Sequence, residues 1–498
     1  MNNLVILYHR QPFAEVIQNG RASFVDHASP NGILPSLRGF FQNVEHGSWI
    51  AWKEEKTDEP FIEKLPAPGN ANYFIRRIPL STEEIRDFYH ITSKEALWPL
   101  LHSFPSYHSS ERANWGNFVA INERFAKAAL EEAGDDTIIW VHDYNLWLAP
   151  AFIRRVKPDA KIAFFHHTPF PASDIFNIIP WSQEILESLL TCDLIGFHIP
   201  RYAENFVRTA KGLEDVRILE REPIEEEAFT PRGSALTEPE ATKKLLFRGR
   251  HVKIDSFPVG INPEAITAIQ AQDIHRARVE RISEELHGRK MLFSVGRVDY
   301  VKGTLELLGA FERLLERRPE LREKIKLVVG TAPAAKGMEV YTTTQNEIEQ
   351  RVGAINGRLA KLDWIPVTHF ARLIPFDEII AYYECADVCL VTPLRDGLNL
   401  VAKEYIATKK GKGGVLVLSE FTGAAVELKD AVLVNPYAVE SMDKAIETSI
   451  DMPQQEAKSR MERLYDHVQQ FTLKRWGEHL FEEFSALDQG RWNKKVVA

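Results

Sequence analysis

Short apolar runs alternate with amphipathic stretches along the whole chain. The runs have the length of buried strands and lie at 4–8, 49–52, 73–78, 138–141, 162–165, 194–197, 254–259, 291–295, 325–329, 388–392, 415–418 and 431–434. Between them apolar positions recur with helical spacing, as at Leu305, Leu308, Phe311 and Leu315, and Pro319 ends that helix. Strands that alternate with helices predict an α/β fold whose parallel sheets are covered on both faces.

A segment rich in proline and glycine divides the chain into two parts. Residues 257–263 read Phe-Pro-Val-Gly-Ile-Asn-Pro, which is typical of a boundary, and 498 residues exceed one ordinary core. We predict an N-terminal lobe over 1–258, a C-terminal lobe over 259–471 and a cleft between them. The remaining segment, 472–498, begins with a helix whose apolar stripe must be buried, and the first lobe is a candidate surface for it. The stripe consists of Trp476, Leu480, Phe481 and Phe484.

Composition narrows the class of protein. Hydrophobic residues make up 44% and charged residues 26% of the chain, as in a globular enzyme. The net charge of -9 argues against nucleic acid as a partner. No apolar stretch has membrane-spanning length, and the three cysteines form no CxxC pair, so we expect a cytoplasmic protein with reduced thiols and no membrane partner. The acidic segment 220–244 is predicted to be a surface excursion of the first lobe.

The strongest functional signal is the segment 392–404, which reads Thr-Pro-Leu-Arg-Asp-Gly-Leu-Asn-Leu-Val-Ala-Lys-Glu. A strand ends there, a turn with Asp396 and Gly397 follows, and a helix begins near Asn399. A helix N-terminus offers free N–H groups and partial positive charge to an anion, and Gly397 lets the backbone approach a phosphate. Glu404 lies about two turns further on, within reach of the hydroxyls of a sugar. The alternative is an ordinary turn with Asp396 as N-cap.

A second segment, 294–303, supplies two cations after a strand. It reads Ser-Val-Gly-Arg-Val-Asp-Tyr-Val-Lys-Gly, so that Arg297 and Lys302 can converge on one diphosphate. Fixed cations stabilise the negative charge that grows on a departing nucleoside diphosphate. The alternative is a solvated basic loop.

Two strand ends in the first lobe carry polar side chains. Asp143 follows the strand 138–141, at a position where an α/β fold faces its cleft, and its carboxylate can accept a hydrogen bond from an acceptor hydroxyl. The alternative for Asp143 is an N-cap. His166 and His167 follow the strand 162–165, and His167, next to a rigid Thr-Pro turn, is the better candidate for the cleft. The sequence supports no Ser/His/Asp triad.

The signals for an acceptor are weaker. Arg10 follows the first strand and Gly32 lies in a loop after it, an arrangement that suits a phosphorylated acceptor. Tyr89 and Trp98 suit the wall of a sugar or polyol site, although such aromatic residues are more often core. No HExxH motif and no DxD pair is present, so we predict no metal and no cofactor, with side-chain cations in place of an ion.

Together these segments resemble the trehalose-6-phosphate synthase family of retaining glycosyltransferases. The resemblance covers essentially the whole chain and depends on the motifs at 140–144, 164–171, 296–303, 355–358 and 393–405. It implies two Rossmann-like lobes, the GT-B architecture, with Asp143, His167, Arg297, Lys302 and Asp396 as catalytic residues. It assigns to the nucleotide-sugar donor Gly32, Arg297, Lys302, Ile374, Asp396, Gly397, Asn399, Leu400, Val401 and Glu404. It assigns to the acceptor Arg10, Trp52, Tyr89, Trp98, Asp143 and Lys336.

Departures from the family pattern resemble one branch, the glucosylglycerol-phosphate synthases. The chain has Tyr8-His9-Arg10 for Ser-Asn-Arg, Asn31-Gly32-Ile33 for Gly-Gly-Leu, Gly296-Arg297 for Glu-Arg, and Lys336 for an arginine that holds the acceptor phosphate. The branch implies ADP-glucose and glycerol 3-phosphate as substrates and compatible-solute synthesis under salt stress. Because the chain ends soon after its last helix, we expect a separate phosphatase to act on the product. Two alternatives stay open, a trehalose-6-phosphate synthase that uses glucose 6-phosphate and a catalytically silent sugar-phosphate sensor. The oligomeric state, a homo-oligomer included, stays open as well.

Overall fold

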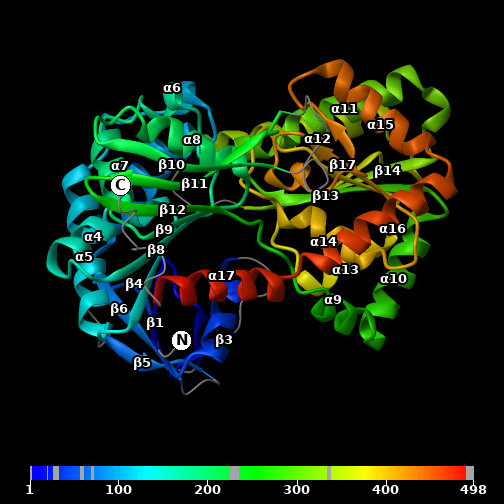
Figure 1. Cartoon of the computed structure of the whole chain (residues 1–498). Helices are drawn as coiled ribbons and strands as arrows, with labels where there is room; N and C mark the ends of the chain where they lie inside the picture. Colours follow the sequence, from blue (N-terminus) through cyan, green and yellow to red (C-terminus); the bar gives the residue numbers. More distant parts are fainter. Residues whose placement is uncertain are drawn as a thin grey trace.

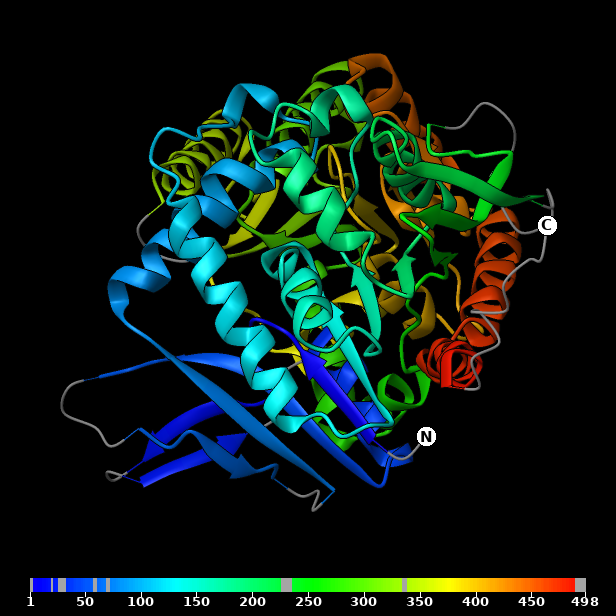
Figure 2. The same ribbon diagram turned by 60° about the vertical axis from the view of Figure 1, so that its left-hand side comes forward.

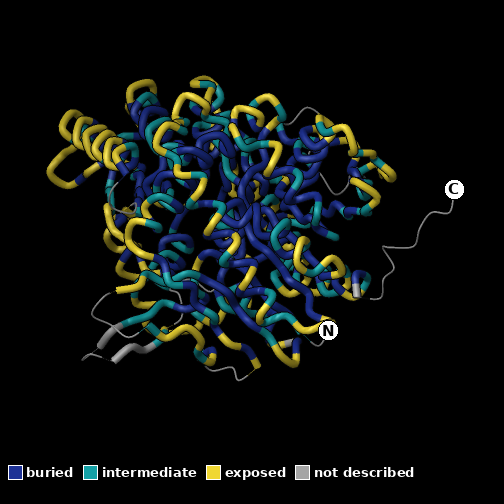
Figure 3. Tube along the Cα trace, turned by 90° about the vertical axis from the view of Figure 1, so that its left-hand side faces the viewer, coloured by how far each residue is buried: buried dark blue, intermediate teal, exposed yellow. Residues whose placement is uncertain are grey.

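The computed structural model describes residues 3–18, 21–25, 33–56, 61–68, 72–224, 235–333 and 338–488. These residues form two α/β lobes that lie side by side, each built on its own sheet (Figure 1). The α/β class predicted from the sequence is confirmed. Buried residues run through the middle of the molecule, and exposed residues lie on the outer turns of the helices (Figure 3).

The sheet of the first lobe has ten strands within the described residues. Their spatial order is β10-β11-β12-β9-β8-β7-β1-β4-β6-β5. In that order the strands are Val216–Pro223, Glu240–Phe247, Arg250–Ser256, Leu194–Phe197, Lys161–His166, Thr137–His142, Asn3–Leu7, His46–Glu54, Tyr73–Leu80 and Lys64–Pro66. A separate antiparallel hairpin, β2 (Ala14–Gln18) and β3 (Arg21–Val25), lies at the lower edge of this lobe in Figure 2.

The first sheet is mixed, so the prediction of purely parallel sheets is wrong for this lobe. The central pairs are parallel, whereas β5 and the β10–β11–β12 edge are antiparallel. Antiparallel neighbours need no crossover helix between them, and the side chains of β10 are mostly exposed, so this strand has no apolar run to detect. The acidic segment 220–244, predicted as a surface excursion, supplies parts of β10 and β11, and its residues 225–234 lie outside the described residues.

Helices pack against both ends of this sheet. The long helix α4 contacts β1, β4 and β6, and α8 contacts β9, β11 and β12. A π-helix, η2 (Arg86–Leu97), runs directly into α3. The α-helices of the lobe are α1 (Ile33–Arg38), α2 (Thr82–Ile85), α3 (Trp98–Leu101), α4 (Trp115–Glu132), α5 (Ala149–Val156), α6 (Ser173–Phe176), α7 (Ser182–Leu189) and α8 (Pro200–Ala210).

The second lobe follows the predicted parallel pattern. Its sheet has the order β15-β14-β13-β16-β17-β18, and its paired strands are parallel. In that order the strands are Val367–Phe370, Ile325–Ala332, Lys290–Arg297, Val388–Val391, Val415–Ser419 and Val432–Val434. The helices are α9 (Pro263–Gln270), α10 (Asp273–Leu286), α11 (Thr304–Arg317), α12 (Glu339–Leu359), α13 (Phe376–Cys385), α14 (Leu400–Thr408), α15 (Val439–Asp451) and α16 (Gln454–Gln470).

The last described helix, α17 (Leu473–Asp488), leaves the second lobe and lies along the first (Figure 1). Trp476 is fully buried there. Its ring meets Phe40 and Phe165 edge-on at centroid distances of 5.4 Å and 5.5 Å. Leu480 and Phe484 are buried beside it, so the apolar stripe of the helix is covered by the first lobe.

The strand orders bring the loops with functional residues together. In the first sheet the chain passes from β1 to β4 on one side and returns to β7 on the other, and in the second sheet β14 and β16 flank β13 in the same way. At such a switch point the loops after neighbouring strands part and leave a crevice. The loops after β1, β7 and β8 carry Arg10, Asp143 and His167. Arg297 is the last residue of β13, and the loop after β16 carries Asp396.

Candidate active site

An ion pair lies just before the N-terminus of α14. Lys302 Nζ lies 2.6 Å from Asp396 Oδ2, and Asn399 Nδ2 donates to the same oxygen at 3.0 Å. Burial raises the pKa of Asp396, but the Lys302 ammonium and the two hydrogen bonds outweigh this effect and hold that pKa below its ordinary value. Asp396 is therefore an anion held in one position, as an acceptor for sugar hydroxyls requires.

Local backbone geometry fixes this pair. Asn399 has a φ of 78° and caps α14, because its side chain accepts the N–H of Ala402 at 3.3 Å. The alternative in which Asp396 is the N-cap is thus wrong. A Cβ atom on Gly397 would lie 2.4 Å from the carbonyl oxygen of His167, so glycine lets the two lobes meet there. Tyr202 of the first lobe also donates its hydroxyl to the carbonyl of Asp396 at 2.9 Å.

Asp143 of the first lobe is held in an unusual conformation. Its φ is 65°, and its side chain caps no helix. Instead Oδ1 accepts the N–H groups of His167 and Thr168 and the Thr168 hydroxyl at 3.2–3.3 Å. Burial raises the pKa of Asp143 to about 6, although these hydrogen bonds oppose the rise. The positive φ marks strain of a kind found at functional sites.

His167 forms a hydrogen bond with a second buried histidine. Its Nε2 lies 3.1 Å from Nδ1 of His142, and burial lowers the pKa of both rings well below the ordinary value. Both rings are therefore neutral, and one donates to the other. Nδ1 of His167 is buried without a protein partner among the described residues, and it can exchange a hydrogen bond with a ligand hydroxyl.

A cavity of about 360 Å³ lies between the lobes. It brings together His167 of the first lobe and most residues that the resemblance assigns to the donor. Its lining consists of Ile33, His167, His198, Val259, Lys302, Asp396, Leu398, Asn399, Leu400, Val401 and Glu404. Predicted donor residues from both sequence segments thus meet in one cavity.

Tyr89 and Trp98, which the resemblance assigns to the acceptor, belong to a neighbouring aromatic group. Trp98 is buried, and the Arg297 guanidinium lies 5.2 Å from its ring centre. Arg297 also pairs with Asp299 at 3.3 Å. Tyr89 stacks on His9 at 5.6 Å, next to Arg10, whose side chain is exposed.

Two described residues of the predicted site, Ile374 and Trp52, do not line this cavity. Ile374 is buried against Gly330 of β14 and does not line the cavity. Trp52 is half-buried on β4 and packs against the core of the first lobe. Gly32 and Lys336 fall outside the described residues.

Three residues near the site escaped the sequence reasoning. His198 lines the cavity, Tyr202 joins the lobes, and Lys94 lies over Trp98. His198 follows the strand β9, so the rule that drew attention to Asp143 and His167 applied to it as well. Tyr202 and Lys94 lie within helices, where no motif singles them out.

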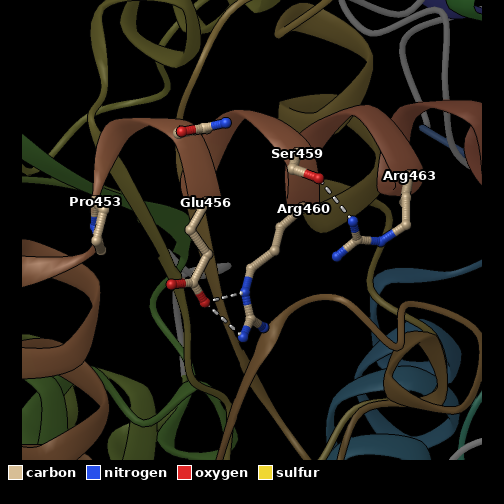
Figure 4. Close-up of a pocket in the computed structure, with 6 residues that line it drawn as sticks. Pro453, Glu456, Ser459, Arg460 and Arg463 are labelled. Carbon is tan, nitrogen blue, oxygen red and sulfur yellow. Dashed lines mark hydrogen bonds and ion pairs between the residues drawn. The ribbon is translucent and has the colours of Figure 1, made fainter.

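A larger surface hollow, of about 470 Å³, lies on α16 and is unrelated to this site (Figure 4). Its two arginines are already paired. Arg460 Nη2 lies 2.9 Å from Glu456, and Arg463 Nη2 lies 2.6 Å from Asp430. The hollow therefore offers no uncompensated charge to a ligand.

In the described part of the chain no group of three or more His, Cys, Asp or Glu side chains is arranged to hold a metal ion. No helix there combines the length and the apolar character needed to cross a bilayer.

The raised pKa of Asp143 gives the site an expected pH dependence. The carboxylate is charged above about pH 6 and neutral below it, so kcat/KM for the acceptor should fall as the pH drops through 6. Asp143→Asn should lower turnover by about 10² or more and remove this acidic limb. The measurement is a kcat/KM profile from about pH 5 to 8. Asp135→Asn, at an exposed position before β7, is the control and should leave the profile unchanged. An unchanged acidic limb in Asp143→Asn would contradict the assignment of this limb to the Asp143 carboxylate.

The fold and the site define the class of protein. Residues 2–486 match the model of glycosyltransferase family 20. The chain belongs to this family and is a glycosyltransferase of the GT-B architecture.

Individual proteins of the family show which of its branches the chain resembles. The chain is 52% identical over 485 residues to glucosylglycerol-phosphate synthase of Synechocystis sp., with 97% of each chain covered. It is 35% identical to trehalose-6-phosphate synthase of Mycolicibacterium vanbaalenii, covering 97% of this chain and 96% of that one. A UDP-forming alpha,alpha-trehalose-phosphate synthase from Burkholderia xenovorans, solved with glucose-6-phosphate, superimposes with a TM-score of 0.83 at 27% identity, covering 97% and 100%. The resemblance to glucosylglycerol-phosphate synthases inferred from the sequence is confirmed.

Proposed function

We propose that the chain transfers glucose from ADP-glucose to glycerol 3-phosphate, giving 2-O-(α-D-glucosyl)-glycerol 3-phosphate and ADP. The observation that carries the reaction type is the interlobe cavity, where Lys302 and Asp396 face His167. The acceptor is supported by the 52% identity to a glucosylglycerol-phosphate synthase. The ADP-glucose donor is supported by the resemblance of residues 8–10, 31–33 and 336 to that branch of the family.

The proposed mechanism needs no covalent enzyme intermediate and no cofactor. Arg10 holds the acceptor phosphate, and the acceptor hydroxyl lies on the same face of the glucose as the leaving diphosphate. As the bond between C1 and the diphosphate oxygen breaks, the sugar becomes oxocarbenium-like and the acceptor oxygen bonds to C1 from that face. The departing phosphate oxygen takes the acceptor's proton, so the anomeric configuration is retained.

The protein supplies position and charge for this step. Lys302 and Arg297 stabilise the negative charge on the leaving diphosphate, while Asp396 and His167 hold the hydroxyls of the transferred glucose. Contact of the lobes at Gly397 and Tyr202 closes the cavity and keeps water from taking the glucose. A separate phosphatase then acts on the phosphorylated product.

The test is a product assay with the purified protein. ADP-glucose and UDP-glucose are each combined with glycerol 3-phosphate and with glucose 6-phosphate, and products are identified by mass. We expect glucosylated glycerol phosphate, formed most rapidly from ADP-glucose. Trehalose 6-phosphate as the main product would overturn the acceptor assignment. The absence of product from every pair would favour the silent sensor.

A further inference from the structure

Lys94 has no role in the proposed transfer, although it lies beside two aromatic residues of the site. Its Nζ lies 3.5 Å from the ring centre of Trp98 and 5.9 Å from that of Tyr89. Both aromatic residues belong to the acceptor side of the site. The contacts are cation–π interactions, which hold an ammonium over a ring without neutralising its charge.

The π-helix is the reason that these three residues share one face. Residues five apart adjoin on a π-helix and residues four apart on an α-helix. Tyr89 and Lys94 are five apart within η2, and Trp98 follows four residues later, where α3 begins. On a continuous α-helix Lys94 would point about 140° away from Tyr89. The irregular helix thus turns a cation toward the aromatic wall.

Lys94 forms no ion pair with the described residues: its close contacts are the two rings, and the carboxylates of Asp299 and Asp143 favour its charged form only from a longer distance. The nearby Arg297 is already paired with Asp299. Burial lowers the pKa of Lys94 to about 7, and the positive charge of Arg297 acts in the same direction. A bound anion would favour the charged form.

The position of Lys94 favours the acceptor over the donor. Neither Lys94 nor Arg297 lines the cavity around Lys302, Asp396 and the start of α14, so the contacts of Lys94 decide between the two substrates. Lys94 instead lies with Tyr89, and Tyr89 stacks on His9 beside Arg10. His9 and Tyr89 thus connect the position of Lys94 with the loop after β1 that carries Arg10.

We propose that Lys94 binds the phosphate of the acceptor together with Arg10, and that the π-helical geometry of η2 orients the Lys94 side chain toward this phosphate. The inference rests on the proposed transfer to a phosphorylated acceptor. Lys94 then differs in role from Lys302, which serves the leaving diphosphate. The occupant is a phosphate monoester small enough to lie against Tyr89 and Trp98.

The test compares Lys94→Met with the unaltered protein. Methionine keeps an apolar stem over Trp98 and removes the charge. For whichever acceptor the unaltered protein uses, glycerol 3-phosphate or glucose 6-phosphate, KM for that acceptor should rise about ten- to a hundredfold, as for one lost hydrogen bond to a charged group. KM for the nucleotide-glucose should change less than about twofold. Lys94→Arg should recover part of the loss, and Lys127→Met, at an exposed position on α4, should change neither value.

Each other outcome has a definite meaning. An unchanged acceptor KM in Lys94→Met, or an equal rise in both KM values, would overturn the assignment. If the unaltered protein uses neither acceptor, the proposed function fails first, and calorimetric titration with inorganic phosphate then tests Lys94 alone. Binding that weakens in Lys94→Met would support the site, and equal or undetectable binding in both proteins would overturn it.

Discussion

Replacement of Lys302 by alanine is expected to lower the turnover number of glucosyl transfer by about 10³-fold. The ammonium lies 2.6 Å from Asp396 at the entrance to α14, where the diphosphate of the donor leaves in the proposed mechanism. Charge stabilisation at a leaving group acts more strongly in the transition state than in the ground state, so kcat should fall more than KM rises. Steady-state kinetics with the nucleotide-glucose varied at saturating acceptor measures this.

The effect of Lys302→Ala on folding should be small by comparison. Asp396 keeps its hydrogen bond from Asn399, and a loss of 1 kcal/mol lowers the melting temperature of a domain of this size by about 2–4 °C. Lys324→Ala is the matched control. Lys324 is exposed and directly precedes β14, so it lies at the end of the sheet where the strands begin, whereas Lys302 lies beyond the end of β13. A variant of Lys302 that melts normally and turns over at the normal rate would contradict its role.

Replacement of Trp476 by alanine is expected to lower the unfolding free energy of the first lobe by about 3–5 kcal/mol. The side chain is fully buried between Phe40, Trp140 and Phe165 although it belongs to the last helix. Its removal leaves a cavity where α17 meets the first lobe, and the helix has no other described surface for its apolar stripe. Chemical denaturation followed by tryptophan fluorescence and by circular dichroism measures the change.

A second position on α17 provides the control for Trp476. Glu482 is exposed on the same helix, and Glu482→Ala should change the unfolding free energy by no more than about 0.5 kcal/mol. If Trp476→Ala unfolded at the same denaturant concentration as Glu482→Ala, α17 would contribute nothing to the first lobe in solution.

The positions of side chains at strand ends could be predicted from the sequence. Asp143, His167 and Asp396 each follow an apolar run, and a run of this kind predicts both a strand and the side of the sheet at which it ends. The strand order then brings the three loops together. The same reasoning applied to His198, which lines the cavity but has no flanking motif.

Features that depend on irregular backbone or on polar strands could not be predicted. Lys94 adjoins Tyr89 because η2 is a π-helix, whereas a periodicity of 3.6 residues per turn places residues five apart on different faces of a helix. The edge strand β10 carries mostly exposed side chains, so it lacks the apolar pattern by which the buried strands were found. The N-cap of α14 is Asn399 and not Asp396, because the Asp396 carboxylate is bound by Lys302, a residue distant in sequence.

The central claim is retention of configuration in transfer of glucose to a phosphorylated acceptor. The most direct measurement follows ADP-glucose labelled with ¹³C at C1 by NMR while the protein acts on it with glycerol 3-phosphate. We expect the donor signal to be replaced by that of an α-glucoside of glycerol phosphate, with one ADP released for each product. A β-glucoside, or free glucose as the main labelled product, would contradict the mechanism.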